Sequence, residues 1–161
     1  MKKTVYIETS IASYLTGRPT RDLLVAAMQQ ITLEWWNIQR HKFDVYVSEL
    51  VVDEIRLGDA DAAKRRLASL QGIASLATTD ETVALAKKLI GEGAIPDKAT
   101  DDAMHVALAA VHGVDYLLTW NCRHIDNAES KPLIRRSCAV AGHPCPEICN
   151  PRELMGGEYI D

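Results

Sequence analysis

Short runs of β-branched and aromatic residues alternate with longer segments of helical periodicity along most of this chain. We expect strands at about 4–8, 43–47, 73–76 and 114–120, with a final short strand at 148–149. The segments between them space their apolar residues at the three- and four-residue intervals of a helix face. Parallel strands need a crossover connection, which is usually a helix. The alternation therefore predicts an α/β fold, a three-layer α/β/α sandwich with a mostly parallel sheet.

Local signals mark where several helices begin and end. We expect helices at about 21–40, 59–70, 78–90, 99–112 and 129–141, and another that begins after Ser48, a favourable N-cap residue. Thr78 with Glu81 three residues later has the spacing of a capping box. Gly72 can adopt the left-handed conformation that often ends a helix. The predicted apolar face of the helix at 21–40 comprises Leu24, Met28, Ile31, Trp35 and Ile38.

Length and composition favour one domain over residues 1–161. A chain of 161 residues with 47% hydrophobic and 25% charged residues can bury a core and lacks the composition of a disordered protein. No apolar run approaches the roughly 20 residues that cross a bilayer, and the start of the chain lacks the apolar length of a secretory leader. The net charge of -4 argues against coating of nucleic acid by bulk charge. We expect a cytoplasmic protein with reduced thiols and no membrane partner.

Acidic and amide side chains follow the expected strands at the edge where parallel sheets bind ligands. Glu8 follows the first strand, Glu54 lies about one helical turn after the second, and Asn121 follows the strand at 114–120. Asp102 opens the helix at 99–112, and these patterns leave open whether it reaches the same edge. Clustered carboxylates repel one another unless a cation neutralises them, and oxygen ligands suit Mg²⁺ or Mn²⁺. The corresponding chemistry is phosphodiester hydrolysis, in which the metal stabilises charge on phosphorus and activates a water.

Four segments, in order, resemble the motifs of PIN-domain proteins and in particular of the VapC-like toxins. They are VYIETS at 5–10, SELVVDE at 48–54, DAMHVA at 102–107 and LTWNCRHI at 118–125, and the tail ICNPREL at 148–154 also resembles the end of that subgroup. The resemblance covers most of the chain and implies a PIN fold and a ribonuclease that depends on Mg²⁺ or Mn²⁺. It also implies an RNA substrate, a cognate antitoxin and a homodimer of the kind known in the family.

The resemblance assigns roles to particular acids. Glu8, Glu54 and Asp102 take the positions of the first three family acids, which bind the metal and act in catalysis. Asn121 takes a catalytic position that is often a fourth acid. Glu8 stands where most PIN proteins have Asp, which moves its carboxylate one methylene further from the backbone, and Asn121 adds no negative charge. Both departures imply weaker metal binding or altered activity.

Three further residues are expected to support this site. Ser10 is expected to orient Glu8 or a water, or alternatively to cap the following helix, and Thr119 is expected to support the ligands in the same way. Arg123 adjoins the proposed catalytic edge, so we expect it to contact an RNA phosphate.

Neighbouring acids are alternatives for two of the ligands, since Asp101 adjoins Asp102, and Asp53 and Glu49 lie on the same predicted helix as Glu54. His105 and His124 are candidates for a general base or a metal ligand, but we interpret both as structural histidines. A zinc site is disfavoured because the spacing lacks a CxxC knuckle. Its candidate ligands are Cys138, His143, Cys145 and Cys149.

Two other functions compete with the ribonuclease hypothesis. The same fold with Glu8 and Asn121 in place of the usual acids is compatible with a catalytically weak or inactive module that binds nucleic acid or a protein. A phosphatase with an aspartyl nucleophile fits less well, because the first strand ends in Glu-Thr-Ser and not in paired aspartates.

Overall fold

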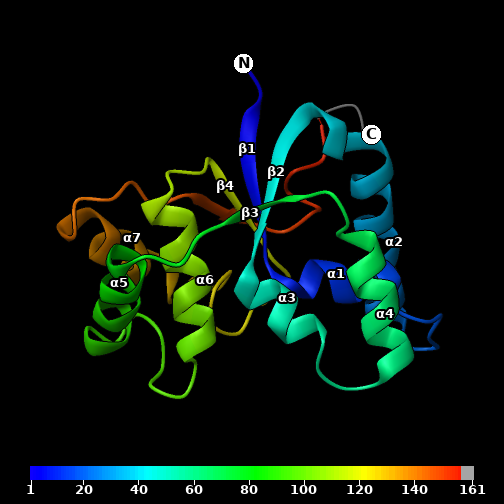
Figure 1. Ribbon diagram of the computed structural model, residues 1–161, viewed down its shortest axis with the longest axis horizontal. Helices are drawn as coiled ribbons and strands as arrows, with labels where there is room; N and C mark the ends of the chain where they lie inside the picture. Colours follow the sequence, from blue (N-terminus) through cyan, green and yellow to red (C-terminus); the bar gives the residue numbers. More distant parts are fainter. Residues whose placement is uncertain (157–161) are drawn as a thin grey trace.

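The computed structural model describes residues 1–156, whose strands form a parallel sheet between two groups of helices (Figure 1). Within this range the sheet has five strands in the order β3-β2-β1-β4-β5, and every neighbouring pair is parallel. The strands are β1 (Lys3–Ile7), β2 (Phe43–Ser48), β3 (Ala74–Leu76), β4 (Tyr116–Leu118) and β5 (Glu147–Cys149). The predicted α/β sandwich is confirmed.

The helices cover the sheet in two sets, α1 to α4 on one side and α5 to α7 on the other (Figure 1). Their bounds are α1 (Thr9–Thr16), α2 (Leu23–Glu34), α3 (Glu49–Ile55), α4 (Ala60–Ser69), α5 (Asp80–Gly91), α6 (Thr100–Val111) and α7 (Lys131–Val140). The expected helix ranges did not include α1, because its residues follow β1 directly and lack a long apolar pattern. Ser10 was considered as a cap of a helix at this place, but Glu8 is the N-cap of α1. No helix in residues 1–156 has the length and apolar character needed to cross a membrane.

The helix expected at 21–40 is divided. Helix α2 ends at Glu34, a π-helical turn spans Trp35–Gln39, and a 3₁₀ turn spans Arg40–Lys42. A π turn contains more residues than an α turn, so it shifts the side chains around the helix axis. Trp35 and Gln39 are buried, whereas Leu24 and Ile38 are exposed, so the predicted apolar face is wrong at its first and last positions.

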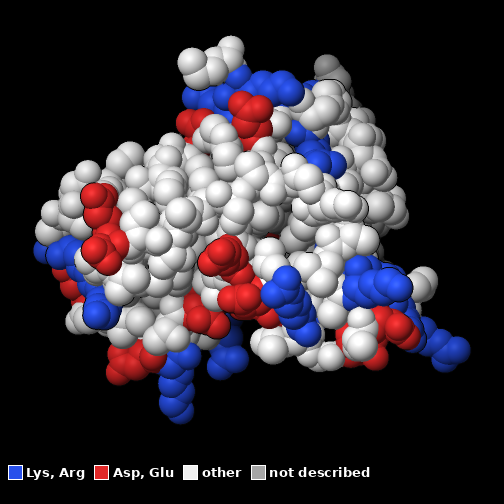
Figure 2. Space-filling model, viewed as in Figure 1, with Lys and Arg blue, Asp and Glu red and all other residues white. Residues whose placement is uncertain are grey.

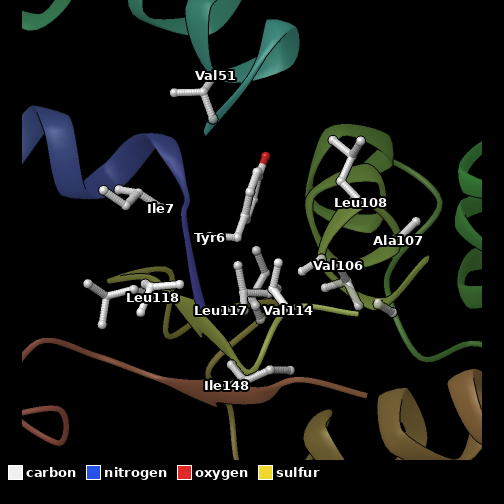
Figure 3. Close-up of a cluster of buried hydrophobic side chains, with 14 of the residues drawn as sticks. Tyr6, Ile7, Val51, Val106, Ala107, Leu108, Val114, Leu117, Leu118 and Ile148 are labelled. Atoms are coloured by element: carbon white, nitrogen blue, oxygen red, sulfur yellow. The ribbon is translucent and has the colours of Figure 1, made fainter. Parts of the chain in front are cut away.

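The core lies along the central strand. Val5, Tyr6 and Ile7 of β1 are all 0% exposed, as expected for a parallel strand covered on both faces. Figure 3 shows Tyr6 among side chains of β4, β5 and α6, with its hydroxyl directed toward α3, the helix that carries Val51. Burial of β1 on both faces fixes its carboxyl end between α1, α3 and α6, where the candidate site lies.

Candidate active site

Glu8 lies at the carboxyl end of β1, where it is the N-cap of α1. Its side chain is nearly buried, with 5% of the residue exposed. Glu8 Oε1 accepts hydrogen bonds from Ser10 Oγ at 2.5 Å and Thr119 Oγ1 at 2.6 Å, and Oε2 accepts one from the Ser10 amide at 3.1 Å. These donors compensate the cost of burying the carboxylate. Glu8 is therefore held firmly beneath the surface of this edge.

The two hydroxyls that hold Glu8 also hold the loop after β4. Ser10 Oγ accepts a hydrogen bond from the Trp120 amide at 2.8 Å, and Thr119 Oγ1 accepts one from the Asn121 amide at 2.9 Å. Each hydroxyl thus donates to Glu8 and accepts from a backbone N–H of the loop. These contacts are of the supporting kind expected for Ser10 and Thr119, and they fix Asn121 close to Glu8.

Glu54 lies in the last turn of α3 and is partly exposed. Its Oε1 accepts hydrogen bonds from Thr9 Oγ1, at 2.7 Å, and from His105 Nε2. Burial tends to raise the pKa of Glu54, but the bonds from His105 and Thr9 and the charge of His105 hold it below its ordinary value. The neighbouring Asp53 and Glu49, considered as alternatives, have exposed side chains.

His105 is completely buried on α6, one helical turn after Asp102. Its Nδ1 is 2.7 Å from the Tyr6 hydroxyl. Burial lowers the pKa of His105, but the bond to Glu54 and the negative charges of Glu8, Glu54 and Asp102 together raise it above its ordinary value. Of the three predicted acids, Glu54 contacts the imidazole directly, and Asp102 lies on the same helix as His105. Our interpretation of His105 as a hydrogen-bonded structural histidine agrees with these contacts.

Asp102 lies in the first turn of α6, and its side chain is 20% exposed. Asp102 Oδ2 is 2.8 Å from His124 Nδ1, and the His124 amide donates to Asn121 Oδ1 at 3.0 Å. His124 thus links Asp102 to the loop that carries Asn121. The adjacent Asp101 is exposed. The connection that the sequence left open does bring Asp102 to the edge where Glu8 lies.

The hydrogen bonds form a continuous path between the two acids that are furthest apart in the sequence. The path runs from Asp102 through His124, Asn121 and Thr119 to Glu8. In the lower middle of the face shown in Figure 2, acidic side chains gather with basic ones around them. Arg123 is exposed in the same loop, two residues after Asn121. The edge therefore combines concentrated negative charge with nearby cationic groups, as a site for a metal and a phosphate requires.

Sequence reasoning missed the contribution of Tyr6. A tyrosine in a buried strand has the pattern of a core residue, and its hydroxyl partners, Ser48 and His105, lie 42 and 99 residues away in the sequence. Ser48 was expected only as an N-cap, which it is, because its side chain accepts from the Val51 amide. One signal in the sequence pointed to a role for Tyr6 in the site, namely its position two residues before Glu8.

The carboxylates that are partly exposed fit a divalent ion better than the buried one. Within residues 1–156, no three His, Cys, Asp or Glu side chains form a ready-made metal site. Glu54 and Asp102 engage Oε1 and Oδ2 in the bonds described above, so Oε2 and Oδ1 remain to bind an ion. Mg²⁺ commonly keeps several waters and binds one or two carboxylates. Glu8 accepts both hydroxyl bonds on Oε1 and the Ser10 amide bond on Oε2, and its role as a third metal ligand stays a prediction.

A comparison with known protein families matches this chain to the PIN domain. The model of the PIN domain matches residues 5–129, which is more than half of the chain. A comparison with curated proteins gives no match. The matched region begins in β1 and includes all four predicted catalytic positions, Glu8, Glu54, Asp102 and Asn121.

Proposed function

Because the chain belongs to the PIN domain family, we propose that it is a metal-dependent endoribonuclease that hydrolyses RNA phosphodiester bonds. PIN domains are generally nucleases, which supports the reaction class. The observation that carries the proposal is the set of hydrogen bonds that holds the three acids at the carboxyl ends of the strands. Asp102 is linked to Glu8 through His124, Asn121 and Thr119, and Glu54 contacts His105 on the helix that carries Asp102. Acids from three distant segments do not gather in this way for packing alone, because their mutual repulsion is costly.

In this proposal Glu54 and Asp102 hold Mg²⁺ or Mn²⁺ through the carboxylate oxygens that their hydrogen bonds leave available. When bound, such an ion neutralises charge on a phosphate and lowers the pKa of a water. Glu8 contributes its negative charge from beneath and, through Ser10 and Thr119, fixes the position of the β4 loop.

The β4 loop supplies the groups that face the substrate. The amide of the Asn121 side chain uses Oδ1 to hold the His124 backbone, so its Nδ2 is the group that can donate to a water or a phosphate oxygen. Arg123 is exposed beside it and is proposed to contact an RNA phosphate. Both assignments follow from their place in one loop that is anchored to Glu8.

We assign the enzyme to toxin–antitoxin systems as a VapC-like toxin because of its sequence resemblance to those proteins. Exposed apolar side chains are compatible with a partner surface, since Leu23 and Leu24 at the start of α2 are 87% and 71% exposed. A cognate antitoxin is the proposed partner, and a homodimer is the proposed assembly. Growth arrest on induction of this protein, relieved by co-expression of a short neighbouring reading frame, would support this assignment; normal growth would contradict it.

Replacement of Asp102 tests the nuclease proposal. We expect Asp102→Asn to keep the hydrogen bond with His124 and the fold, but to lower Mg²⁺- or Mn²⁺-dependent RNA cleavage by more than about a hundredfold, since even residues that only support metal ligands contribute about 10–100-fold. Cleavage of a labelled RNA is measured with Mn²⁺ and again with excess chelator. The exposed neighbour gives a matched control, Asp101→Asn, which should cleave as the wild type does.

A binding module without catalysis is the second candidate, because Glu8 is buried and hydrogen-bonded and Asn121 replaces an acid. This candidate predicts that the protein binds RNA or a partner but that neither the wild type nor Asp101→Asn cleaves any RNA with Mg²⁺ or Mn²⁺. Equal cleavage by Asp102→Asn and wild type would instead contradict the assignment of the site.

A further inference from the structure

A circuit of side-chain hydrogen bonds runs through the protein interior beneath the candidate site. The Tyr6 hydroxyl is 2.8 Å from Ser48 Oγ and 2.7 Å from His105 Nδ1, and His105 Nε2 contacts Glu54. Ser48 accepts a hydrogen bond from the Val51 amide at 3.3 Å, and it is the N-cap of α3, the helix that carries Glu54. These bonds, which we call the Tyr6 circuit, thus connect the N-terminus of α3, at Ser48, with its last turn, at Glu54.

Each member of the Tyr6 circuit lies close in sequence to one of the predicted acids. Tyr6 is two residues before Glu8 in the β1 segment, and His105 is one helical turn after Asp102 on α6. Ser48 caps the helix that carries the third acid. The circuit therefore ties together the three segments whose relative placement brings the acids to one edge.

The donors and acceptors of the circuit form one consistent order. With a neutral imidazole that carries its proton on Nε2, the Val51 amide donates to Ser48, Ser48 to Tyr6, Tyr6 to His105, and His105 to Glu54. A protonated imidazole keeps the bond to Glu54 and turns the Tyr6 hydroxyl toward Ser48. The Glu54 carboxylate is held in both states.

Burial makes this arrangement rigid. Tyr6, Ser48 and His105 are each 0% exposed, whereas the Glu54 side chain is 26% exposed. Hydrogen bonds in a buried network strengthen one another, and a partner left unpaired there is costly. Thr9 donates to the same Glu54 oxygen as His105 does, so both bonds fix Oε1 and direct the remaining oxygen, Oε2, away from the circuit.

We infer that Tyr6, Ser48 and His105 are positioning residues that set the orientation of the Glu54 carboxylate for metal binding. They act through Glu54 and contact neither metal nor substrate. The inference rests on the proposed function only for its effect on metal and RNA, because the circuit itself is a set of contacts within the protein.

Replacement of Tyr6 by Phe tests the inference, since it removes one hydroxyl and keeps the ring that fills the core. We expect Tyr6→Phe to weaken Mn²⁺ binding and to lower kcat for RNA cleavage by about tenfold or more, with KM for RNA changed less than about twofold. A matched control is Tyr46→Phe, because Tyr46 is the direct sheet partner of Tyr6 and lies outside the circuit. The control should bind Mn²⁺ and cleave RNA as the wild type does.

Two further measurements separate positioning from a loss of folding. The Nε2 proton of His105, followed by NMR, should exchange slowly with solvent in the wild type and in Tyr46→Phe, and faster in Tyr6→Phe. His105→Gln, which keeps a side-chain donor near Glu54, should retain more Mn²⁺ affinity than His105→Leu. Circular dichroism melts identify any variant that is unfolded at the assay temperature.

The outcomes distinguish this inference from the proposed function. If Tyr6→Phe matches Tyr46→Phe in Mn²⁺ affinity, in kcat and in exchange of the His105 proton, the positioning role is wrong. If the wild type neither binds Mn²⁺ nor cleaves RNA, the proposed function fails, and exchange of the His105 proton in Tyr6→Phe then decides alone whether the circuit holds the imidazole in place. Faster exchange supports the circuit, and unchanged exchange refutes it.

Discussion

A buried carboxylate at the end of β1 is the residue-scale feature on which the site depends. Glu8 is nearly inaccessible, and the hydroxyls of Ser10 and Thr119 satisfy one of its oxygens. Since each hydroxyl also accepts from the β4 loop, loss of either one weakens two contacts at once. The stability of the fold and the shape of the site are therefore linked at these residues.

Thr119→Val should destabilise the protein by about 1–3 kcal/mol, because it leaves the Asn121 amide without its partner and removes one of the two hydroxyls that donate to Glu8 Oε1 in a nearly dry environment. Urea unfolding at neutral pH measures the change. Thr119→Ser keeps the hydroxyl and should cost clearly less. A loss in Thr119→Ser that equals or exceeds the loss in Thr119→Val would mean that the methyl group of Thr119 contributes at least as much as its hydrogen bonds.

The sequence located Glu8, Asn121 and the neighbouring Ser10 and Thr119 because they follow strands, and the carboxyl ends of parallel strands share an edge. Strand and helix positions pointed to Glu54 and Asp102 as candidates, and the family resemblance was needed to prefer them to Asp101, Asp53 and Glu49. In the structure Glu54 and Asp102 are partly buried, whereas their neighbours are exposed, and this difference depends on how each helix is rotated against the sheet. Local spacing does not fix that rotation.

At the scale of elements, the sequence placed each strand within a few residues and erred where a local signal had a close competitor. The capping box of α5 was expected at Thr78 with Glu81, but Thr79 is the N-cap and pairs with Thr82. The two registers differ by one residue and both present a threonine. The position of the preceding strand decides between them, because it sets where the chain reaches the start of α5.

The capping assignment predicts a difference between two adjacent threonines. Thr79→Ala should lower the free energy of unfolding by about 1 kcal/mol, because it removes the side chain that accepts from the Thr82 amide. Thr78→Ala should change it by less than about 0.5 kcal/mol. Chemical denaturation of both variants checks the prediction. A larger loss of unfolding free energy in Thr78→Ala than in Thr79→Ala would indicate that Thr78 is the N-cap, as expected from the sequence.

The beginnings of β1 and β4 are joined by a carboxylate whose effect depends on pH. The Thr4 amide donates to Asp115 Oδ2 at 2.8 Å, and this bond is the main reason why the pKa of Asp115 lies below its ordinary value. Burial acts in the opposite direction and raises this pKa, and the Thr4 hydroxyl and the Lys3 ammonium group lower it further. Ionised Asp115 therefore stabilises the pairing of these strands.

Because the pKa of Asp115 is lower in the folded than in the unfolded chain, its stabilising effect is complete above the unfolded value of about 3.9 and is lost as the pH falls through the folded pKa. We expect the stability difference between wild type and Asp115→Asn to be constant from about pH 7 to about pH 5 and to shrink below about pH 4. Urea titrations across this range measure it. A difference that stays constant down to about pH 2.5 would show that the charge of Asp115 is unimportant.

At the scale of the whole molecule, the order of the strands in the sheet brings the acids together, which no single sequence motif can do. Glu8, Glu54 and Asp102 lie on three elements that are distant in the sequence, and the central position of β1 between β2 and β4 brings those elements together. Alternating strands and helices were sufficient to predict the sandwich. They were insufficient to predict that α6 turns Asp102 and His105 toward the same edge, because that depends on packing across the entire sheet.

Titration with Mn²⁺, followed by electron paramagnetic resonance, tests most directly whether this edge assembles a metal site. The account predicts saturable binding by the wild type, loss of that binding in Asp102→Asn and in Glu54→Gln, and binding as in the wild type for the exposed neighbours Asp101→Asn and Asp53→Asn. Equal Mn²⁺ binding by all five proteins, or none by the folded wild type, would contradict it.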